Sequence, residues 1–206
     1  MIRFAQLYHA IDSTTKTNEK VTALANYFAA APAADAAWAI YFLAGNKLRQ
    51  LVPTKLLRMW AAEAAAIPAW LFEESYHAVG DLAETLSLVV PPGTLVGDDT
   101  LTHWIEQRLM PLRLLDESAQ REAMLELWRQ TPAPTRLVIM KLVTGAFRVG
   151  VSKGLVTRAI GQQSGVAPDV IAHRLMGNWK PSPSFYQRLI DPDVQDTLHS
   201  QPFPFC

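Results

Sequence analysis

A chain of 206 residues in which half of the residues are apolar can bury a hydrophobic core without help from a metal or a disulfide. Its single cysteine, Cys206, excludes an intrachain disulfide framework and a cysteine-based zinc cluster. Lys and Arg together number 19, and so do Asp and Glu, so the net charge of zero excludes a uniformly basic nucleic-acid binder.

The first predicted elements are two amphipathic helices near the N-terminus. Apolar residues recur there at helical spacing, at Phe4, Leu7, Tyr8 and Ile11 and then at Val21, Leu24, Ala25 and Phe28. Polar residues interrupt the first stretch, so it is not a signal peptide, and no apolar run approaches the roughly 20 residues that span a bilayer. We therefore expect a cytoplasmic protein without a membrane partner.

Further along the chain, proline, glycine and capping residues divide the sequence into about ten helices. Thr54 and Pro68 are predicted to open two of them, since Thr caps a helix well and Pro fits its first turn. Residues 91–100 indicate a long surface loop, and helices resume near Leu101 and Asp116. No alternating β-branched run is long enough for a strand, so the predicted class is all-α, a multi-helix bundle.

A weak internal repeat relates the two sides of that loop. Residues 38–45 and residues 138–145 are both mostly apolar and end at a glycine, and basic residues and a new helix follow each of them. Two apolar helices can also align by chance, and this alternative stays open. If the repeat is real, the bundle has two pseudo-symmetric lobes, at about residues 1–90 and 100–190.

The second half of the chain is basic. Residues 1–128 contain ten Lys or Arg and fifteen Asp or Glu, whereas residues 129–206 contain nine and four. Between Arg129 and Arg188 the one acidic residue is Asp169. We expect the basic side chains of residues 129–190 to form one contiguous positive face that suits a polyanion, although charge asymmetry is also common on solvated helical surfaces.

Residues 145–154 are the most informative segment, a basic, glycine-rich turn that leads into a helix. Its three glycines allow positive φ and a close approach of the backbone to a ligand. The N–H groups after Ser152 are suited to an anion such as phosphate, and Thr157 is expected on the outward side of the helix. Positive charge comes from Arg148, Lys153 and Arg158. The alternative interpretation is structural: a glycine ends one helix and Ser152 caps the next.

Several motifs of the chain recur in a known family. The segments Lys141–Gly145 and Phe147–Ser152, then Leu155, Val156 and Ala159, resemble the N-terminal DNA-binding domain of ATP-dependent DNA ligases of bacterial type. The opening helix with Phe4–Leu7 and the segment Tyr41–Leu48 are similar to the family in the same order. The resemblance covers roughly residues 1–190.

This resemblance implies a helical domain of two pseudo-symmetric lobes that grips nicked duplex DNA through the minor groove and the phosphates. The family's DNA-contacting positions carry over to Gly145, Arg148, Gly150 and Ser152, and in the first half to Lys47, Arg49, Thr54 and Lys55, where the turn lacks a second glycine. Residues 1–200 would then be the DNA-binding domain of a monomeric, nucleoid-associated enzyme that seals nicks in DNA repair, replication or recombination.

The nucleophile that the family requires is missing from the sequence. These ligases adenylate the lysine of a Lys-x-Asp-Gly motif, and the chain contains no such tetrapeptide. The resemblance implies that residues 201–206 begin a linker into a nucleotidyltransferase domain and an OB-fold domain, where the parent enzyme would bind ATP and Mg²⁺. We therefore expect this chain to be an excised domain with no catalytic residue, metal site or cofactor of its own.

Other chemistry-bearing residues favour structural roles. The five histidines share no ligand spacing, and five of the six tryptophans are expected in the core. The sixth, Trp179, lies in a basic loop, where it could contact a sugar edge or pack beneath the turn. Two other functions stay open: a helical protein–protein interaction module whose basic region meets an acidic partner, and a DNA-processing enzyme, for which the basic segment offers only Asp169 as acid or base.

Overall fold

The protein is all-α, as predicted. The computed structural model describes residues 1–94, 97 and 99–194, and in this part of the chain it contains twelve α-helices and no strand. A π-helical turn, η1 (Trp104–Leu109), and a 3-10 turn, η2 (Met110–Leu114), continue the short helix α7. The α-helices are α1 (Ile2–Asp12), α2 (Thr17–Ala30), α3 (Ala33–Leu43), α4 (Thr54–Ala64), α5 (Ala69–Val79), α6 (Leu82–Val89), α7 (Leu101–His103), α8 (Glu117–Arg129), α9 (Ala133–Thr144), α10 (Lys153–Ser164), α11 (Pro168–Arg174) and α12 (Pro183–Ile190).

Two expectations from the sequence concern membrane-spanning helices and the last residues of the chain. In the described ranges, no helix combines the length and the apolarity that crossing a bilayer demands. The segment 201–206, interpreted above as the start of a linker, lies outside the described residues, and so does Cys206.

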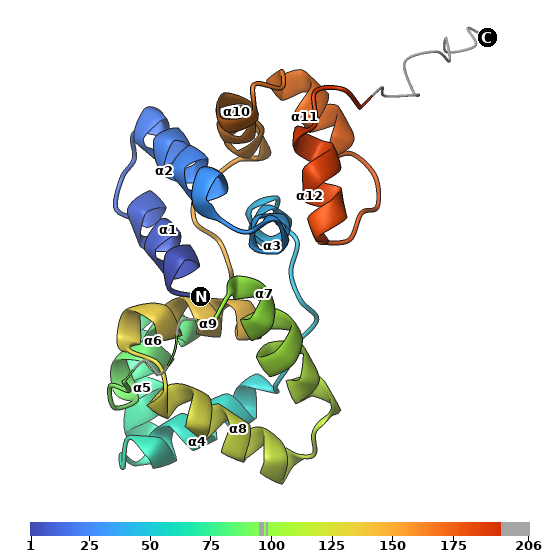
Figure 1. The fold of residues 1–206 in the computed structure, drawn as a ribbon. Coiled ribbons are helices and arrows are strands. Elements are labelled where there is room, and N and C mark those ends of the chain that lie inside the picture. Colours follow the sequence, from blue (N-terminus) through green and yellow to red (C-terminus); the bar gives the residue numbers. More distant parts are fainter. Residues whose placement is uncertain (95–96, 98, 195–206) are drawn as a thin grey trace, which may run out of the picture.

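The helices form two lobes, one built from both ends of the chain and the other from its middle. One lobe contains α1, α2 and α3 together with α10, α11 and α12, and the other contains α4 to α9 (Figure 1). The chain crosses to the second lobe after α3 and returns after α9. This division corrects the expected one, which separated residues 1–90 from residues 100–190. Helical periodicity identifies the apolar face of a helix but not the distant helix that covers it, and here α2 packs on α10 and α6 packs on α9.

Each lobe has an aromatic core. In the first lobe the ring of Phe4 is stacked on Phe147 at a centroid distance of 5.5 Å and lies 6.4 Å from Phe42. In the second lobe Trp60 and Trp128 are fully buried. Of the five tryptophans expected in the core, four are buried, and the exception is Trp70, which is 66% exposed near the start of α5.

Buried polar contacts fix the two lobes to each other. The carboxylate of Asp35, in α3, accepts hydrogen bonds from the backbone N–H groups of Leu101 and Thr102 at 3.0 and 2.9 Å, and from the Thr102 hydroxyl at 2.7 Å. Nearby, the indole N–H of Trp38 donates to Glu106 at 3.0 Å. Asp35 is buried, so these bonds are shielded from water and hold the start of α7 against α3.

Candidate nucleic-acid interface

Helices α3 and α9 end in the same way. The N–H of Gly45 donates to the carbonyl three residues earlier at 2.9 Å, and the N–H of the next residue donates to the carbonyl five residues earlier at 3.1 Å. Around Gly145 the same two bonds measure 3.3 and 2.9 Å. Both glycines have positive φ, +90° and +70°, which residues with a side chain rarely adopt. The internal repeat noticed in the sequence thus has a structural counterpart at both helix ends.

The connections that follow these two glycines are the places where the chain passes between the lobes. We name residues 44–53 the first crossover and residues 145–152 the second crossover. They run in opposite directions between the lobes (Figure 1) and meet at Gly145, where a Cβ atom would lie 3.7 Å from Cδ of Lys47 and 3.9 Å from the carbonyl oxygen of Leu48. The fold therefore brings together two turns that lie one hundred residues apart in the sequence.

The second crossover presents its side chains alternately to the core and to solvent. Phe147 and Val149 are buried, whereas Ala146, Arg148 and Gly150 are exposed. An extended backbone places successive side chains on opposite sides, so anchoring Phe147 and Val149 in the core directs Arg148 outward. The ring of Phe147 also lies 5.6 Å from the ring of Tyr8, which adds to this anchor.

A lysine from a different helix holds the tip of this crossover. Gly150 has a φ of +61°, and its carbonyl oxygen accepts a 2.9 Å hydrogen bond from Nζ of Lys20, in α2. A Cβ atom at Gly150 would lie 3.3 Å from the same Nζ, so glycine leaves room for this contact. Sequence reasoning missed Lys20, because no local pattern links α2 to a turn 130 residues away.

Ser152 caps α10, as the structural interpretation of the turn predicted. Its hydroxyl accepts a hydrogen bond from the N–H of Leu155 at 3.3 Å. The N–H groups of Lys153 and Gly154 belong to the first turn of the helix, which has no intrahelical acceptor for them. The cap and an exposed pair of backbone donors therefore occur together.

Thr157 and Arg158, both expected on the outward side of α10, have different surroundings. Thr157 is buried rather than outward, and its hydroxyl donates to the carbonyl oxygen of Gly154 at 3.0 Å. Arg158 is exposed, but its guanidinium donates to the side chain of Asn18 at 3.1 Å. Arg158 thus links α10 to α2, and one of its N–H donors is already used by Asn18.

The first-half residues divide between the two lobes. Lys47 and Arg49 are exposed on the first crossover, and Lys47 lies beside Gly145. Thr54 and Lys55 are exposed on the first turn of α4, in the second lobe. The N-cap of α4 is Pro53, so Thr54 is not the cap that the sequence predicted. Lys55 lines a separate cavity between α4 and α5.

Comparison with known proteins gives the family of this chain. A family model described as DNA ligase N terminus matches residues 1–161. The chain belongs to the family of N-terminal domains of ATP-dependent DNA ligases. The match includes both crossovers and all ten predicted site residues, but it ends inside α10, earlier than the expected limit near residue 190. A search of curated proteins returned no match.

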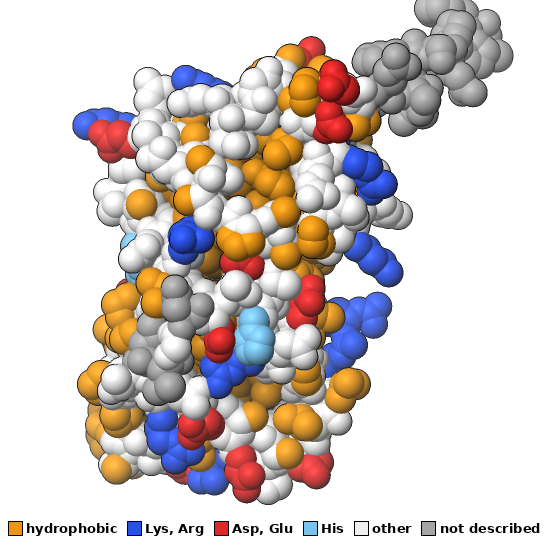
Figure 2. Space-filling view, viewed as in Figure 1, with side chains coloured by type: hydrophobic (Ala, Val, Ile, Leu, Met, Phe, Trp, Pro, Cys, Tyr) orange, Lys and Arg blue, Asp and Glu red, His pale blue; other side chains and the backbone are white. Residues whose placement is uncertain are grey.

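The basic residues of this ligase domain do not form the contiguous face that the charge count predicted. Arg136 is fully buried, and its guanidinium donates to four backbone carbonyl oxygens at 2.7 to 2.9 Å. Lys141 is buried and paired with Asp81 at 2.9 Å. Arg129 lies in the second lobe, in an ion pair with Glu126. On the face in Figure 2, side chains of both charges are scattered over both lobes. The prediction counted structural cations as surface charge.

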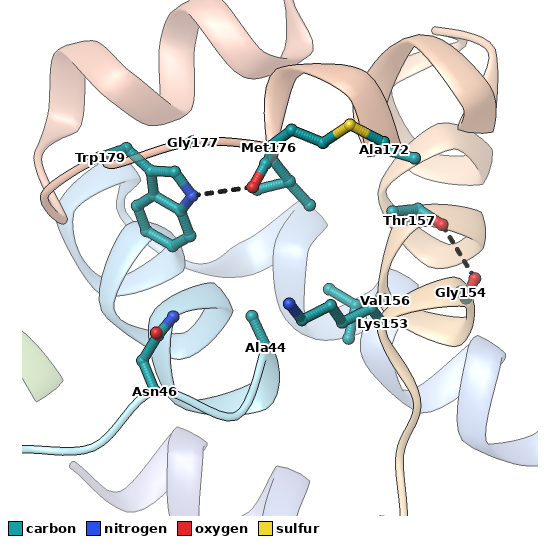
Figure 3. Close-up of a pocket in the computed structure, with 11 residues that line it drawn as sticks. Ala44, Asn46, Lys153, Gly154, Val156, Thr157, Ala172, Met176, Gly177 and Trp179 are labelled. Carbon is teal, nitrogen blue, oxygen red and sulfur yellow. Dashed lines mark hydrogen bonds between the residues drawn. The ribbon is translucent and has the colours of Figure 1, made fainter.

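Trp179 both packs beneath the turn and borders a cavity of the ligase domain. Its ring is stacked on Phe185 at a centroid distance of 4.3 Å, and its indole N–H donates to the carbonyl oxygen of Leu175 at 3.2 Å. The cavity beside it has a volume of about 500 Å³ and also involves Lys153 (Figure 3). Within residues 1–94, 97 and 99–194, no three His, Cys, Asp or Glu side chains gather as metal ligands would.

Proposed function

We propose that this ligase N-terminal domain binds nicked duplex DNA, with the second crossover against the minor groove and its flanking phosphates. The observation that carries the proposal is the position of Arg148, which is exposed between two buried anchors on a backbone held by Lys20. An arginine presented in this way can enter a narrow groove or bridge phosphate oxygens, because its planar guanidinium offers several donors.

The neighbours of Arg148 support the same role. Lys153 and the backbone donors at the start of α10 suit phosphate, and the glycines at 145 and 150 permit the positive φ that shapes this turn. Lys47 and Arg49, on the adjacent first crossover, add two exposed cations. Thr54, Lys55 and Arg158 are weaker candidates, since the first two begin α4 in the other lobe and Arg158 bonds to Asn18.

The catalytic steps of nick sealing are assigned to other domains of the parent enzyme. The chain has no Lys-x-Asp-Gly motif, so it lacks the lysine that these ligases adenylate. A nucleotidyltransferase domain and an OB-fold domain would supply this chemistry in a monomeric cytoplasmic enzyme of DNA repair, replication or recombination. The isolated chain should therefore form no covalent adduct with AMP.

Gel-shift titrations with nicked, intact and single-stranded DNA at several salt concentrations test the proposal. Nicked duplex should bind best, with little dependence on sequence and with a log–log salt slope of about −0.9 for each phosphate contact. Incubation with ATP and Mg²⁺ should leave the mass of the chain unchanged. Absence of duplex binding at low salt would contradict the DNA-binding role and favour the second candidate, a protein–protein interaction module with an acidic partner.

A further inference from the structure

A cavity lies where the first crossover, the start of α10 and residues 175–179 come together. Its volume is about 500 Å³, a size typical of small-molecule sites. Eleven residues line it, and none of them is acidic. Three have polar or aromatic side chains that matter here, namely Asn46, Lys153 and Trp179. The remaining lining is mostly apolar.

The polar groups of the cavity face a common space. In Figure 3 the carboxamide of Asn46 and the indole of Trp179 point toward each other, and the side chain of Lys153 extends from the start of α10 toward Ala44. Ala44 and Asn46 come from the end of α3, which Gly45 holds in place by its left-handed conformation. The cavity is therefore built on a fixed helix end rather than on a loop alone.

The chemistry of these groups matches the parts of a nucleotide. The ammonium group of Lys153 suits a phosphate, and a carboxamide such as that of Asn46 can pair with the donor and acceptor edge of a base. Aromatic and thioether groups such as those of Trp179 and Met176 provide surfaces for a planar ring. Met176 is 71% exposed at the edge of the cavity, so it can move over a bound ring.

We propose that this cavity binds a nucleotide, with the base against Trp179 and Met176 and the phosphate on Lys153. A nucleotide with this chemistry has two sources: an unpaired nucleotide of bound DNA, such as a one-nucleotide flap at a nick, or a free mononucleotide. Binding of a free mononucleotide does not depend on the proposed DNA-binding function, so the two hypotheses can fail separately.

The six indole N–H signals of ¹⁵N-tryptophan-labelled protein provide a direct measurement. A Trp179→Phe variant identifies the Trp179 signal, after which the labelled protein is titrated with AMP, with nicked duplex, and with nicked duplex that carries a one-nucleotide flap. AMP or the flap should shift the Trp179 signal. Trp70 is the internal comparison, because it is exposed in the other lobe and should not move with AMP.

Two matched methionine variants test whether the response comes from the cavity or from any added negative charge on the surface. Met176→Asp places a negative charge at the mouth of the cavity, whereas Met110→Asp makes the same change at an exposed methionine of the second lobe. Met176→Asp should weaken the nucleotide effect at least about tenfold, the scale of a lost stacking contact with added repulsion, and Met110→Asp should not.

The outcomes distinguish the two sources of the nucleotide and also decide whether the cavity binds one. A response to AMP that Met176→Asp removes supports the site with a free nucleotide. A response to the flap alone, also removed by Met176→Asp, supports it with an unpaired nucleotide of DNA. If neither AMP nor the flap moves the Trp179 signal, or if Met176→Asp and Met110→Asp behave alike, the cavity is not a nucleotide site. The flap source rests on the proposed function, so failure of flush nicked DNA to bind would count against that function and leave AMP as the test of the cavity.

Discussion

Lys20 and Gly150 are joined by a 2.9 Å hydrogen bond from the lysine ammonium to the glycine carbonyl oxygen, across 130 residues of sequence. This bond connects α2 to the tip of the second crossover, where Gly150 has positive φ. It makes Lys20 a positioning residue for the proposed DNA contact of Arg148, because it fixes the backbone that carries the arginine.

The first prediction concerns this positioning role. Lys20→Gln should weaken binding to nicked duplex by about 1 kcal/mol, the net value of a typical hydrogen bond, while the salt slope changes by much less than 0.9 because no phosphate contact is lost. Lys20→Arg, which keeps a charged donor, should restore most of the affinity. Fluorescence anisotropy at several salt concentrations measures both quantities.

Lys16→Gln is the matched control, since Lys16 is an exposed lysine that precedes the same helix and pairs with Glu19. Its affinity should equal that of the parent. A slope reduced by about 0.9 in Lys20→Gln would instead mean that Lys20 contacts a phosphate directly.

The second prediction concerns Arg136, whose guanidinium holds together the backbone around Val90, Pro91, Trp128 and Thr131. Arg136→Met should lower the free energy of unfolding by on the order of 3–5 kcal/mol, because it leaves several buried carbonyl oxygens without a donor. Urea titration followed by circular dichroism measures this loss. Arg148→Met, at an exposed position, should stay within about 0.5 kcal/mol of the parent. Equal stability of the two variants would contradict a structural role for Arg136.

Arg136 also shows why a charge count predicts only part of a surface. The sequence identified the all-α class, the start of a helix near Asp116, the cap at Ser152 and the glycine ends of both crossover helices, because caps, glycines and periodicity act locally. It did not reveal that Arg136 and Lys141 are buried. A basic residue within an apolar helix gives the same sequence pattern whether its side chain faces solvent or a set of carbonyl oxygens. Burial is decided by the partner that packs against the helix.

The same reason explains why the sequence predicted neither the lobe boundaries nor the contact of Lys20. Each crossover was recognisable from its glycine and basic residues, but their adjacency depends on the packing of α2 with α10 and of α6 with α9. The energetic preference for these pairs is distributed over many apolar contacts between distant segments. No short motif in one sequence records such a preference.

The third prediction is a pH dependence of stability at the Asp81–Lys141 pair. Partial burial by itself raises the pKa of Asp81, but the hydrogen bond from Lys141 and the N-cap hydrogen bond from Glu84 outweigh it and hold the pKa below its ordinary value of 3.8. A carboxylate with a depressed pKa contributes stability above its unfolded-state pKa, and this contribution is lost as the pH falls through the folded-state pKa. The acid loss should therefore occur below about pH 4.

Asp81→Asn isolates this effect, because Asn still caps α6 but carries no charge. The variant should be less stable than the parent by about 1–2 kcal/mol at neutral pH, a modest value because Asp81 is partly exposed, and the difference should shrink as the pH falls below about 4. Thermal unfolding at a series of pH values tests this. A difference that does not change with pH would mean that the ion pair contributes nothing.

The last prediction concerns Arg148, which the second crossover exposes between two buried residues and to which the sequence resemblance assigns a DNA contact. If Arg148 lies in the minor groove or against its phosphates, Arg148→Ala should weaken duplex binding across all sequences by on the order of 1–3 kcal/mol. The melting curve should match that of the parent, because the arginine is exposed and its anchors Phe147 and Val149 are unchanged. Arg113→Ala is the matched control, since Arg113 is an exposed arginine of the second lobe outside the proposed site.

Lys153→Ala extends the same measurement to the start of α10. If the Lys153 ammonium neutralises one phosphate, the variant should reduce the magnitude of the salt slope by about 0.9. The Ser152 cap uses a hydroxyl and a backbone N–H, so a purely structural turn requires no change of slope in Lys153→Ala. Affinities and slopes of Arg148→Ala and Lys153→Ala that equal those of Arg113→Ala would place the DNA-binding surface away from the second crossover. The alternation of buried and exposed residues there would then serve only to carry the chain between the lobes.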